Sequence, residues 1–284
     1  MTYQRREIEV EFTLSEGSFD QANGNVLTLK NMKCELSVSA FGGLAGTTLE
    51  LRLYGLSINY AAKITGKSQK VLEQKQNLVK IKVNGEDLFV GTIVASRLNL
   101  NQVPDAAIEI TATTTGYEQS LPCPDTTVKG DTKVQDLLKA IAGRVGLSFI
   151  NVDVDLVASS PHYTGNAIEQ INKIAVAYNL SYYVDMGSLI VATGANPLDS
   201  ITPLISPSSG LIGYPIFIDY GINFTCMFSS SIKVLRNIKL ETDLPNATGI
   251  YQVLEGTTHY LSQYVEGGPW FTMVTAFPQE YLEK

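Results

Sequence analysis

The sequence predicts a mainly β protein with an α+β insert in its middle. Two observations indicate this: polar and apolar residues alternate along both ends of the chain, and helical spacing is concentrated in the middle. A third observation is a short internal repeat: "IAVAYNLSYYV" at 174–184 resembles "IAGRVGLSFI" at 141–150. We therefore expect three parts, at 1–115, 116–200 and 201–284: a β module, two small helix-strand units, and a second β module.

The first part has the pattern of a compact all-β module. In "EIEVEFTL", Ile8, Val10, Phe12 and Leu14 alternate with polar residues, which places them on one face of a strand. The same alternation covers 32–38, 49–53 and 79–83, a further strand is expected in 107–116, and Asn84-Gly85 supplies a positive-φ hairpin turn. With one short helix near 59–65, five to seven strands form a barrel or a sandwich.

Near the start of the middle part, the turn-rich stretch "LPCPDTTVKGDT" at 121–132 marks the change in the character of the sequence. Helical spacing of apolar residues follows it, and Gly146 stands where a helix C-cap favours positive φ. In the second unit, Asn166 and Glu169 form a capping-box pattern, and Asn179 takes the position of the glycine. A hairpin around 185–187 ends this part, and the stretch that follows it is rich in Pro and Gly before the strands resume.

Composition limits the possible functions. The net charge of -7 lacks the clustered basic surface of a nucleic-acid binder. Cys34, Cys123 and Cys226 are widely spaced and predict free thiols, not a zinc site or a disulfide framework. The N-terminus lacks the apolar run of a signal peptide, and no stretch approaches the ~18 apolar residues of a membrane span, so we expect a protein made in a cytosol.

The sequence favours a protein that is not an enzyme, with no catalytic residues, metal ligands or cofactor assigned. His162 and His259 are the only histidines, and neither lies in a metal or nucleophile motif. We expect His162 in a solvated loop and His259 as a hydrogen-bonded strand residue. A hydrolase remains an open alternative, because 28 carboxylates always allow some acidic pair.

One segment resembles the opening of a LysM peptidoglycan-binding module. In "VKGDTKVQDLLKAIAGRVGLS" at 128–148, the matching residues are Gly130, Asp131, Thr132, Ile141, Ala142, Gly146 and Leu147. The stretch between Thr132 and Ile141 is longer than in that family, and the second helix is missing. The resemblance implies glycan binding as an alternative function. A structural interpretation explains the same residues: Gly-Asp-Thr is a turn and an N-cap that lead into an amphipathic helix.

A second resemblance covers roughly residues 26–278. The segments "ELRLYGLS", "IKVNGEDLFVGTIVASRL", "DLLKAIAGRVGL", "SGLIGYPIF" and "EGGPWFTMVTAFP" occur in the order seen in bacteriophage tail baseplate hub proteins of contractile-tailed phages. This resemblance implies two tube-like β-barrel domains joined by the helix-strand units. Nothing in the chain corresponds to a lysozyme or spike domain.

The resemblance also implies the partners. Hub proteins form homotrimers that join a six-fold tail tube protein to a three-fold spike protein, contact wedge proteins of the baseplate, and line a channel. It implies a virion protein of the tail baseplate, assembled in the host cytoplasm. The acidic balance suits a wall that DNA passes without binding. As interface residues we assign Tyr214, Pro215, Gly267, Gly268, Pro269 and Trp270. Trp270 either anchors an interface or packs inside the second barrel.

Overall fold

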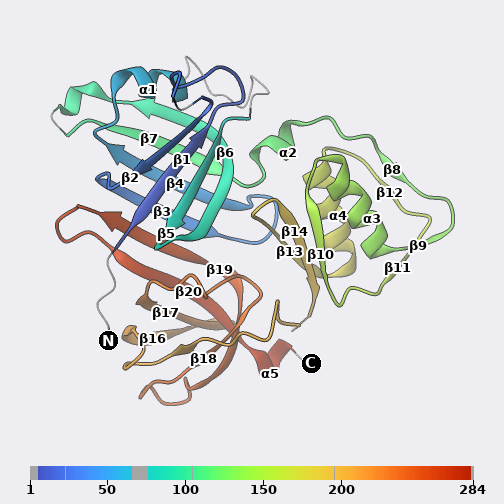
Figure 1. The fold of residues 1–284 in the computed structure, drawn as a ribbon. Coiled ribbons are helices and arrows are strands. Elements are labelled where there is room, and N and C mark those ends of the chain that lie inside the picture. Colours follow the sequence, from blue (N-terminus) through green and yellow to red (C-terminus); the bar gives the residue numbers. More distant parts are fainter. Residues whose placement is uncertain (1–5, 23, 66–75, 104, 195, 283–284) are drawn as a thin grey trace.

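The computed structural model describes residues 6–22, 24–65, 76–103, 105–194 and 196–282. Figure 1 shows a curved group of N-terminal strands in blue and cyan, a helix pair at its side in green and yellow, and a second group of strands in orange and red. The predicted mainly β fold with an α+β insert is confirmed. Separate clusters of buried apolar residues lie in the three parts, while the boundaries at 1–115, 116–200 and 201–284 stay a prediction.

Seven antiparallel strands and a short helix make up the first part. They are β1 (Ile8–Thr13), β2 (Val26–Lys30), β3 (Cys34–Ala40), β4 (Thr47–Tyr54), α1 (Ile58–Ile64), β5 (Leu78–Val83), β6 (Glu86–Leu98) and β7 (Ala107–Thr113). They pair in the order β3-β4-β7-β6-β5-β1-β2. The predicted turn at Asn84-Gly85 joins β5 to β6, with φ of 52° and 86°.

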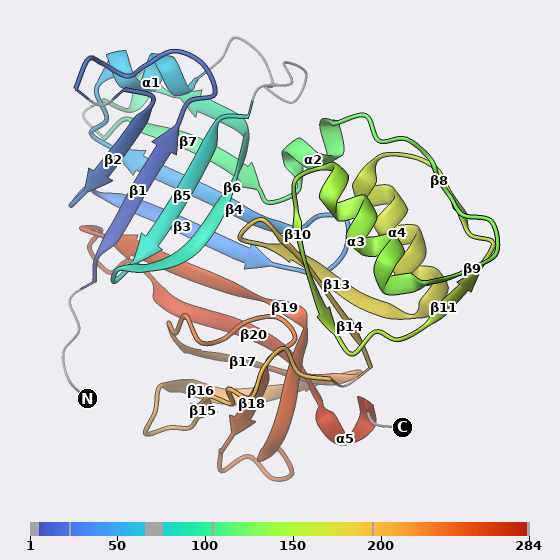
Figure 2. The same ribbon diagram turned by 45° about the vertical axis from the view of Figure 1, so that its right-hand side comes forward.

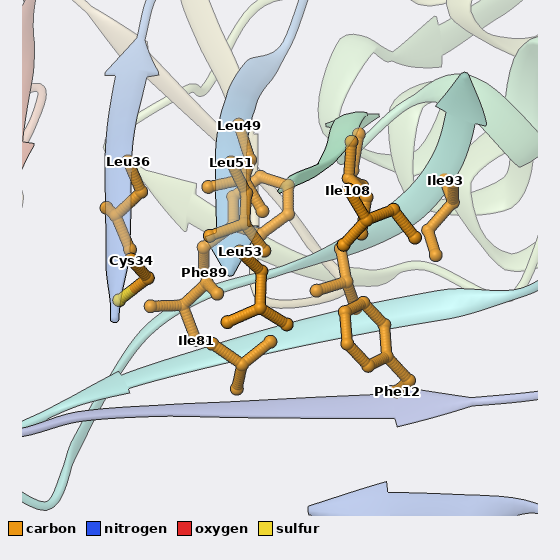
Figure 3. Packing of buried hydrophobic residues seen from close by; sticks show 14 of the residues in the cluster. Phe12, Cys34, Leu36, Leu49, Leu51, Leu53, Ile81, Phe89, Ile93 and Ile108 are labelled. Carbon is orange, nitrogen blue, oxygen red and sulfur yellow. The ribbon is translucent and has the colours of Figure 1, made fainter. Parts of the chain in front are cut away.

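The sheet of the first part curves around a single apolar core. Alternate side chains of β1 and β3 to β7 point into it, as Figure 3 shows for Phe12, Leu51, Ile81, Phe89 and Ile108. All five are at most 2% exposed, so period-2 alternation correctly identified the inward faces of β1, β3, β4, β5 and β7, for which it was used. At about 1.5–3 kcal/mol for each fully buried large side chain, this core is the main source of stability in the first part.

Two helices on a small sheet form the middle part. After 3-10 helix η2 (Leu100–Gln102) and helix α2 (Gly116–Ser120), the elements are β8 (Thr126–Thr127), β9 (Asp131–Lys133), α3 (Val134–Arg144), β10 (Ser148–Val152), β11 (Val157–Ser159), β12 (His162–Tyr163), α4 (Ala167–Tyr178), β13 (Leu180–Asp185) and β14 (Ser188–Thr193). The sheet order is β10-β14-β13, with β10 parallel to β14.

The repeated sequence corresponds to two similar helix-to-strand turns. Gly146 leads from α3 into β10 with φ 80°, and Asn179 leads from α4 into β13 with φ 52°. The capping box of Asn166 and Glu169 is confirmed at the start of α4. Both helices bury their apolar faces in one cluster, so the two units share a core.

The last part contains β15 (Leu204–Ile205), β16 (Leu211–Ile218), β17 (Gly221–Met227), β18 (Asn237–Leu240), β19 (Gly249–Gln263), β20 (Trp270–Pro278) and α5 (Gln279–Leu282). Its strands pair in the order β16-β17-β20-β19, with β18 and β15 off this path. The hairpin β13-β14 packs on it through a small cluster that contains Tyr183, Ile190 and Leu235.

The first and last parts share one continuous sheet, which the sequence did not predict. Strand β19 pairs antiparallel with β3, from Thr257 opposite Ala40 to Gln263 opposite Cys34. This ladder brings together strands more than 200 positions apart in the chain and yields a 13-stranded sheet. Figure 2 shows β3 and β19 side by side at the seam between the blue and red strands.

Candidate interaction surface

The six residues assigned to an interface lie on two elements. Tyr214 and Pro215 are in β16, Gly267, Gly268 and Pro269 form the turn between β19 and β20, and Trp270 begins β20. Tyr214 is 69% exposed, whereas Pro215 is buried. Their role in an interface stays a prediction.

Trp270 packs at the seam between the first and last parts. Its ring stacks edge-on against Phe228 with centroids 5.5 Å apart, and the guanidinium of Arg6 lies 5.3 Å from the ring centroid. The half-buried indole contacts the core of the first part. The tryptophan therefore stabilises the junction within one chain, a position that neither sequence interpretation described.

The glycines before Trp270 have a structural reason. Gly267 has φ 66°, and a Cβ at Gly268 would stand 2.2 Å from the side-chain oxygen of Ser262. That hydroxyl donates a 3.0 Å hydrogen bond to the carbonyl of Pro269. The turn therefore closes only because residue 268 has no side chain.

A run of exposed apolar side chains follows β16, a terminal strand of the 13-stranded sheet. Ile212, Tyr214, Ile216, Phe217, Ile218 and Tyr220 are 39–78% exposed. Pairing with β17 shifts between Ile212 and Ile216, where Gly213 has φ 69°. Of these six exposed side chains, only Tyr214 was predicted at an interface, although "LIGYPIFIDY" lacks the polar alternation of a half-covered strand.

A groove of about 880 Å³ adjoins this strand. Phe217, Ile218 and Tyr220 form one wall, Ile250 and Tyr251 belong to β19, and 277–281 close the other side. Burial raises the pKa of Tyr251, so its phenol stays neutral near neutral pH. The groove presents aromatic and aliphatic surface beside Asp219 and Glu280, so it suits apolar side chains of a partner with polar groups at their edge.

His259 lies where all three parts meet. It is 4% exposed, its Nδ1 is 2.8 Å from the hydroxyl of Thr272, and it lies opposite Val38 of β3. It lines a cavity of about 40 Å³ together with Tyr183 and Asp185 of the middle part and Lys233. Burial, with a smaller effect of Lys233, lowers its pKa to about 4, so the imidazole is neutral at pH 7. The predicted hydrogen-bonded strand position is confirmed.

The other residues considered for chemistry lie apart. His162 is exposed in the two-residue strand β12, where a loop was expected, 2.7 Å from the hydroxyl of Thr127. Cys34 and Cys226 are buried thiols in the first and last cores, and burial raises the pKa of each to about 12. Thiols protonated at neutral pH are poor nucleophiles. Within the described ranges, no three His, Cys, Asp or Glu side chains gather as metal ligands.

The segment that resembles LysM forms a turn, a strand and a helix. Gly130 has φ 89°, Asp131 and Thr132 pair with β11, and α3 follows directly. Gly130 therefore forms the predicted turn. The predicted N-cap is wrong, because Asp131 and Thr132 belong to strand β9 and the N-cap of α3 is Lys133, whose side chain makes no capping hydrogen bond. Glycan binding by this segment stays a prediction. In the described part of the chain, no helix has the length and apolarity needed to cross a bilayer.

Known structures share this arrangement over nearly the whole chain. A tail protein from Neisseria meningitidis MC58 superposes with a TM-score of 0.68 at 9% identity, over 95% of this chain and 96% of its own. The 43 kDa tail protein of prophage MuSo2 from Shewanella oneidensis gives 0.66 at 7% identity, over 96% and 98%. The fold is therefore that of phage-type tail proteins.

A third structure belongs to a secretion machine. It is an Escherichia coli component of the type VI secretion system, which itself shows structural similarity to the T4 bacteriophage tail proteins gp27 and gp5. It matches with a TM-score of 0.61 at 8% identity, over 87% of this chain and 73% of its own. No curated protein sequence matches the chain.

The family is defined by sequence. Residues 46–257 match the family model described as baseplate hub gp41, which covers more than half of the chain. The chain belongs to this family, and its recognition as a phage tail baseplate hub protein is confirmed. The match runs from the start of β4 to the beginning of the β19–β3 ladder, so it includes the middle part and segments of the first and last parts.

Proposed function

We propose that the protein is the trimeric hub that joins the six-fold tail tube to a three-fold spike. The observation that carries this proposal is the continuous sheet: two curved β parts in one chain are joined rigidly by the β19–β3 ladder. Three chains in a closed ring then present six such parts.

The first and last parts share one structural feature, a long strand with a closely packed glycine, and this supports their equivalence. Each contains one long strand, β6 or β19, whose pairing register shifts along its length. A Cβ at Gly91 in β6 would stand 2.8 Å from the carbonyl oxygen of Thr113, and one at Gly256 in β19 would stand 2.5 Å from that of Ala40. Glycine bends of this kind curve a sheet toward closure.

Electron microscopy of the purified assembly tests the proposal. We expect a three-fold ring with six similar β densities around a channel. A stable monomer or an even-numbered ring would refute it. Tail particles isolated from the host give the second readout, because the chain should occur there in three copies.

A non-enzymatic role is part of the proposal. Its support is that the buried thiols and His259 are held neutral inside the fold, while His162 is exposed and contacts a hydroxyl. We expect His162→Ala to leave assembly and infection unchanged. Loss of infection by correctly assembled particles of this variant would favour a hydrolase.

The partners and location follow from the same proposal. The hub would contact tube, spike and wedge proteins in the virion after assembly in the host cytoplasm. DNA would pass its acidic channel wall without binding, since negative walls repel phosphate. Retention on insoluble peptidoglycan separates this function from glycan binding, because the hub predicts negligible retention.

A further inference from the structure

The terminal strand β16 leaves an apolar surface uncovered. We define the β16 patch as Ile212, Tyr214, Ile216, Phe217, Ile218 and Tyr220, and each of these side chains is at least 39% exposed. The segment 211–218 contains no charged residue. Single exposed apolar residues need no explanation, whereas a contiguous group indicates a contact surface.

The size of the β16 patch approaches half of a standard interface. Phe217 lies on the opposite face of the strand from Ile216 and Ile218, beside the groove. At about 200 Å² for each large side chain, the exposed fractions of the other five members sum to roughly 600 Å². The largest patch on a typical monomer is about 300–600 Å², and a standard interface buries about 800 Å² on each partner. The adjoining groove of about 880 Å³ adds a concave site for a protruding side chain.

The edge of β16 disfavours simple strand addition. Gly213 to Pro215 are out of register with β17, and Pro215 has no N–H to donate. Bulges and prolines on edge strands prevent uncontrolled pairing. A partner therefore recognises the β16 patch mainly through side chains, and Tyr214 protrudes at the bulge with 69% exposure.

We propose that the β16 patch and its groove dock on a second copy of this chain, head to tail. This inference rests on the proposed trimeric function. A closed three-fold ring needs two different surfaces on each copy. Three other exposed apolar side chains, those of Ile58, Leu100 and Val103, belong to the first part. Figures 1 and 2 place α1, which begins at Ile58, at the opposite end of the molecule from β16.

This arrangement explains why the two groups cannot cover each other within one chain. It assigns Ile58, Leu100 and Val103 as the counter-surface on the neighbouring copy. Because the two surfaces differ, the contact repeats around a ring and does not stop at a two-fold dimer.

The test uses the purified full chain and the double variant Tyr214→Ser/Ile216→Ser. The matched control is Val157→Ser/Val176→Ser, which removes two exposed apolar side chains from the middle part. Native mass spectrometry over a concentration series gives the oligomeric state. We expect the control to assemble like the wild type. The dissociation constant of the patch variant should be roughly 100-fold higher than that of the wild type, as for loss of two hot-spot residues.

A photo-reactive p-benzoylphenylalanine at position 214 maps the partner. Cross-linking to the region of Ile58 or Leu100 in a second copy supports the inference. A wild-type monomer, a patch variant that assembles normally, or cross-links only to other regions of the second copy would overturn it. The proposed function is judged separately, because a normally assembling patch variant leaves the three-fold hub intact, whereas absence of the wild type from tail particles refutes the hub.

Discussion

Leu36 of β3 lies directly opposite Leu261 of β19, and both side chains are buried in the core of the first part. Leu261 is the one fully buried member of that cluster contributed by the last part. A hydrophobic core that includes a residue from the distant end of the chain couples the folding of both parts. The seam is therefore a packed interior and not only a hydrogen-bonded edge.

Leu261→Ala should lower the free energy of unfolding by about 3 kcal/mol, because removal of a fully buried leucine leaves a cavity. Urea denaturation followed by tryptophan fluorescence measures the change, since Trp270 lies opposite Leu261. Ile250→Ala is the control on the same strand, where the side chain is 48% exposed and the expected loss is below about 1 kcal/mol. Equal losses in the two variants would contradict a shared core.

Gly256→Ala should also destabilise the seam, by about 2–3 kcal/mol. Gly256 has φ 141°, and a Cβ there would meet the carbonyl oxygen of Ala40 at 2.5 Å. Gly143→Ala is the matched control, because Gly143 lies in α3 with open space around its Cβ position. Since alanine favours helix, this control should gain about 0.5–1 kcal/mol. Thermal unfolding of both variants measures the change in stability against the wild type. A Gly256→Ala protein as stable as the wild type would show that the bend tolerates a side chain.

Much of the local structure was predictable because its causes are local. Asn84-Gly85 and the Asn166–Glu169 capping box depend on a few neighbouring residues, and both occur as predicted. The pairing of β19 with β3 was not predictable, since alternation identifies the buried face of a strand and not its partner. The same limit applies to Trp270: its position after a turn was visible, but not its contact with Phe228 and the first core.

The candidate interaction surface was predicted only through Tyr214. The remaining members of the β16 patch are apolar, and a run of apolar residues equally indicates a strand buried on both faces. Exposure depends on whether another strand covers β16, which is a property of the whole sheet. Pro215 illustrates the converse, because it was assigned to an interface and is buried by its own chain.

His259 should make stability depend on pH between about 4 and 6.5. Its pKa is lowered to about 4 by burial, whereas the unfolded chain titrates near 6.5. In this window the unfolded state binds a proton that the folded state does not, so stability falls as pH decreases and is fully restored above about 6.5. The slope approaches about 1.4 kcal/mol per pH unit at most.

Denaturation of the wild type and of His259→Gln at pH 7 and pH 5 isolates this contribution. Glutamine offers Thr272 a hydrogen-bond partner and does not titrate, so the difference between the two proteins should shrink at pH 5. A difference that stays constant with pH would show that His259 titrates normally in the folded protein.

The Arg236–Asp199 pair should respond unequally to loss of its two members. Arg236 is 7% exposed and donates two hydrogen bonds to Asp199, whose side chain is 34% exposed. Burial opposes ionisation of Asp199, yet the hydrogen bonds from Arg236 and from the backbone N–H of Ile201, together with the positive charges of Arg236 and Lys233, outweigh this and lower the pKa. Asp199→Ala leaves a buried guanidinium without its carboxylate, and we expect a loss of about 3 kcal/mol. Arg236→Met keeps the apolar stem and leaves only a partly hydrated carboxylate, so we expect a loss of about 1 kcal/mol.

Urea denaturation of the two variants and of the double variant gives the coupling energy between the two side chains. A larger loss in Arg236→Met than in Asp199→Ala would mean that donation to the carbonyl of Ser231, and not the ion pair, is the main contribution of this arginine.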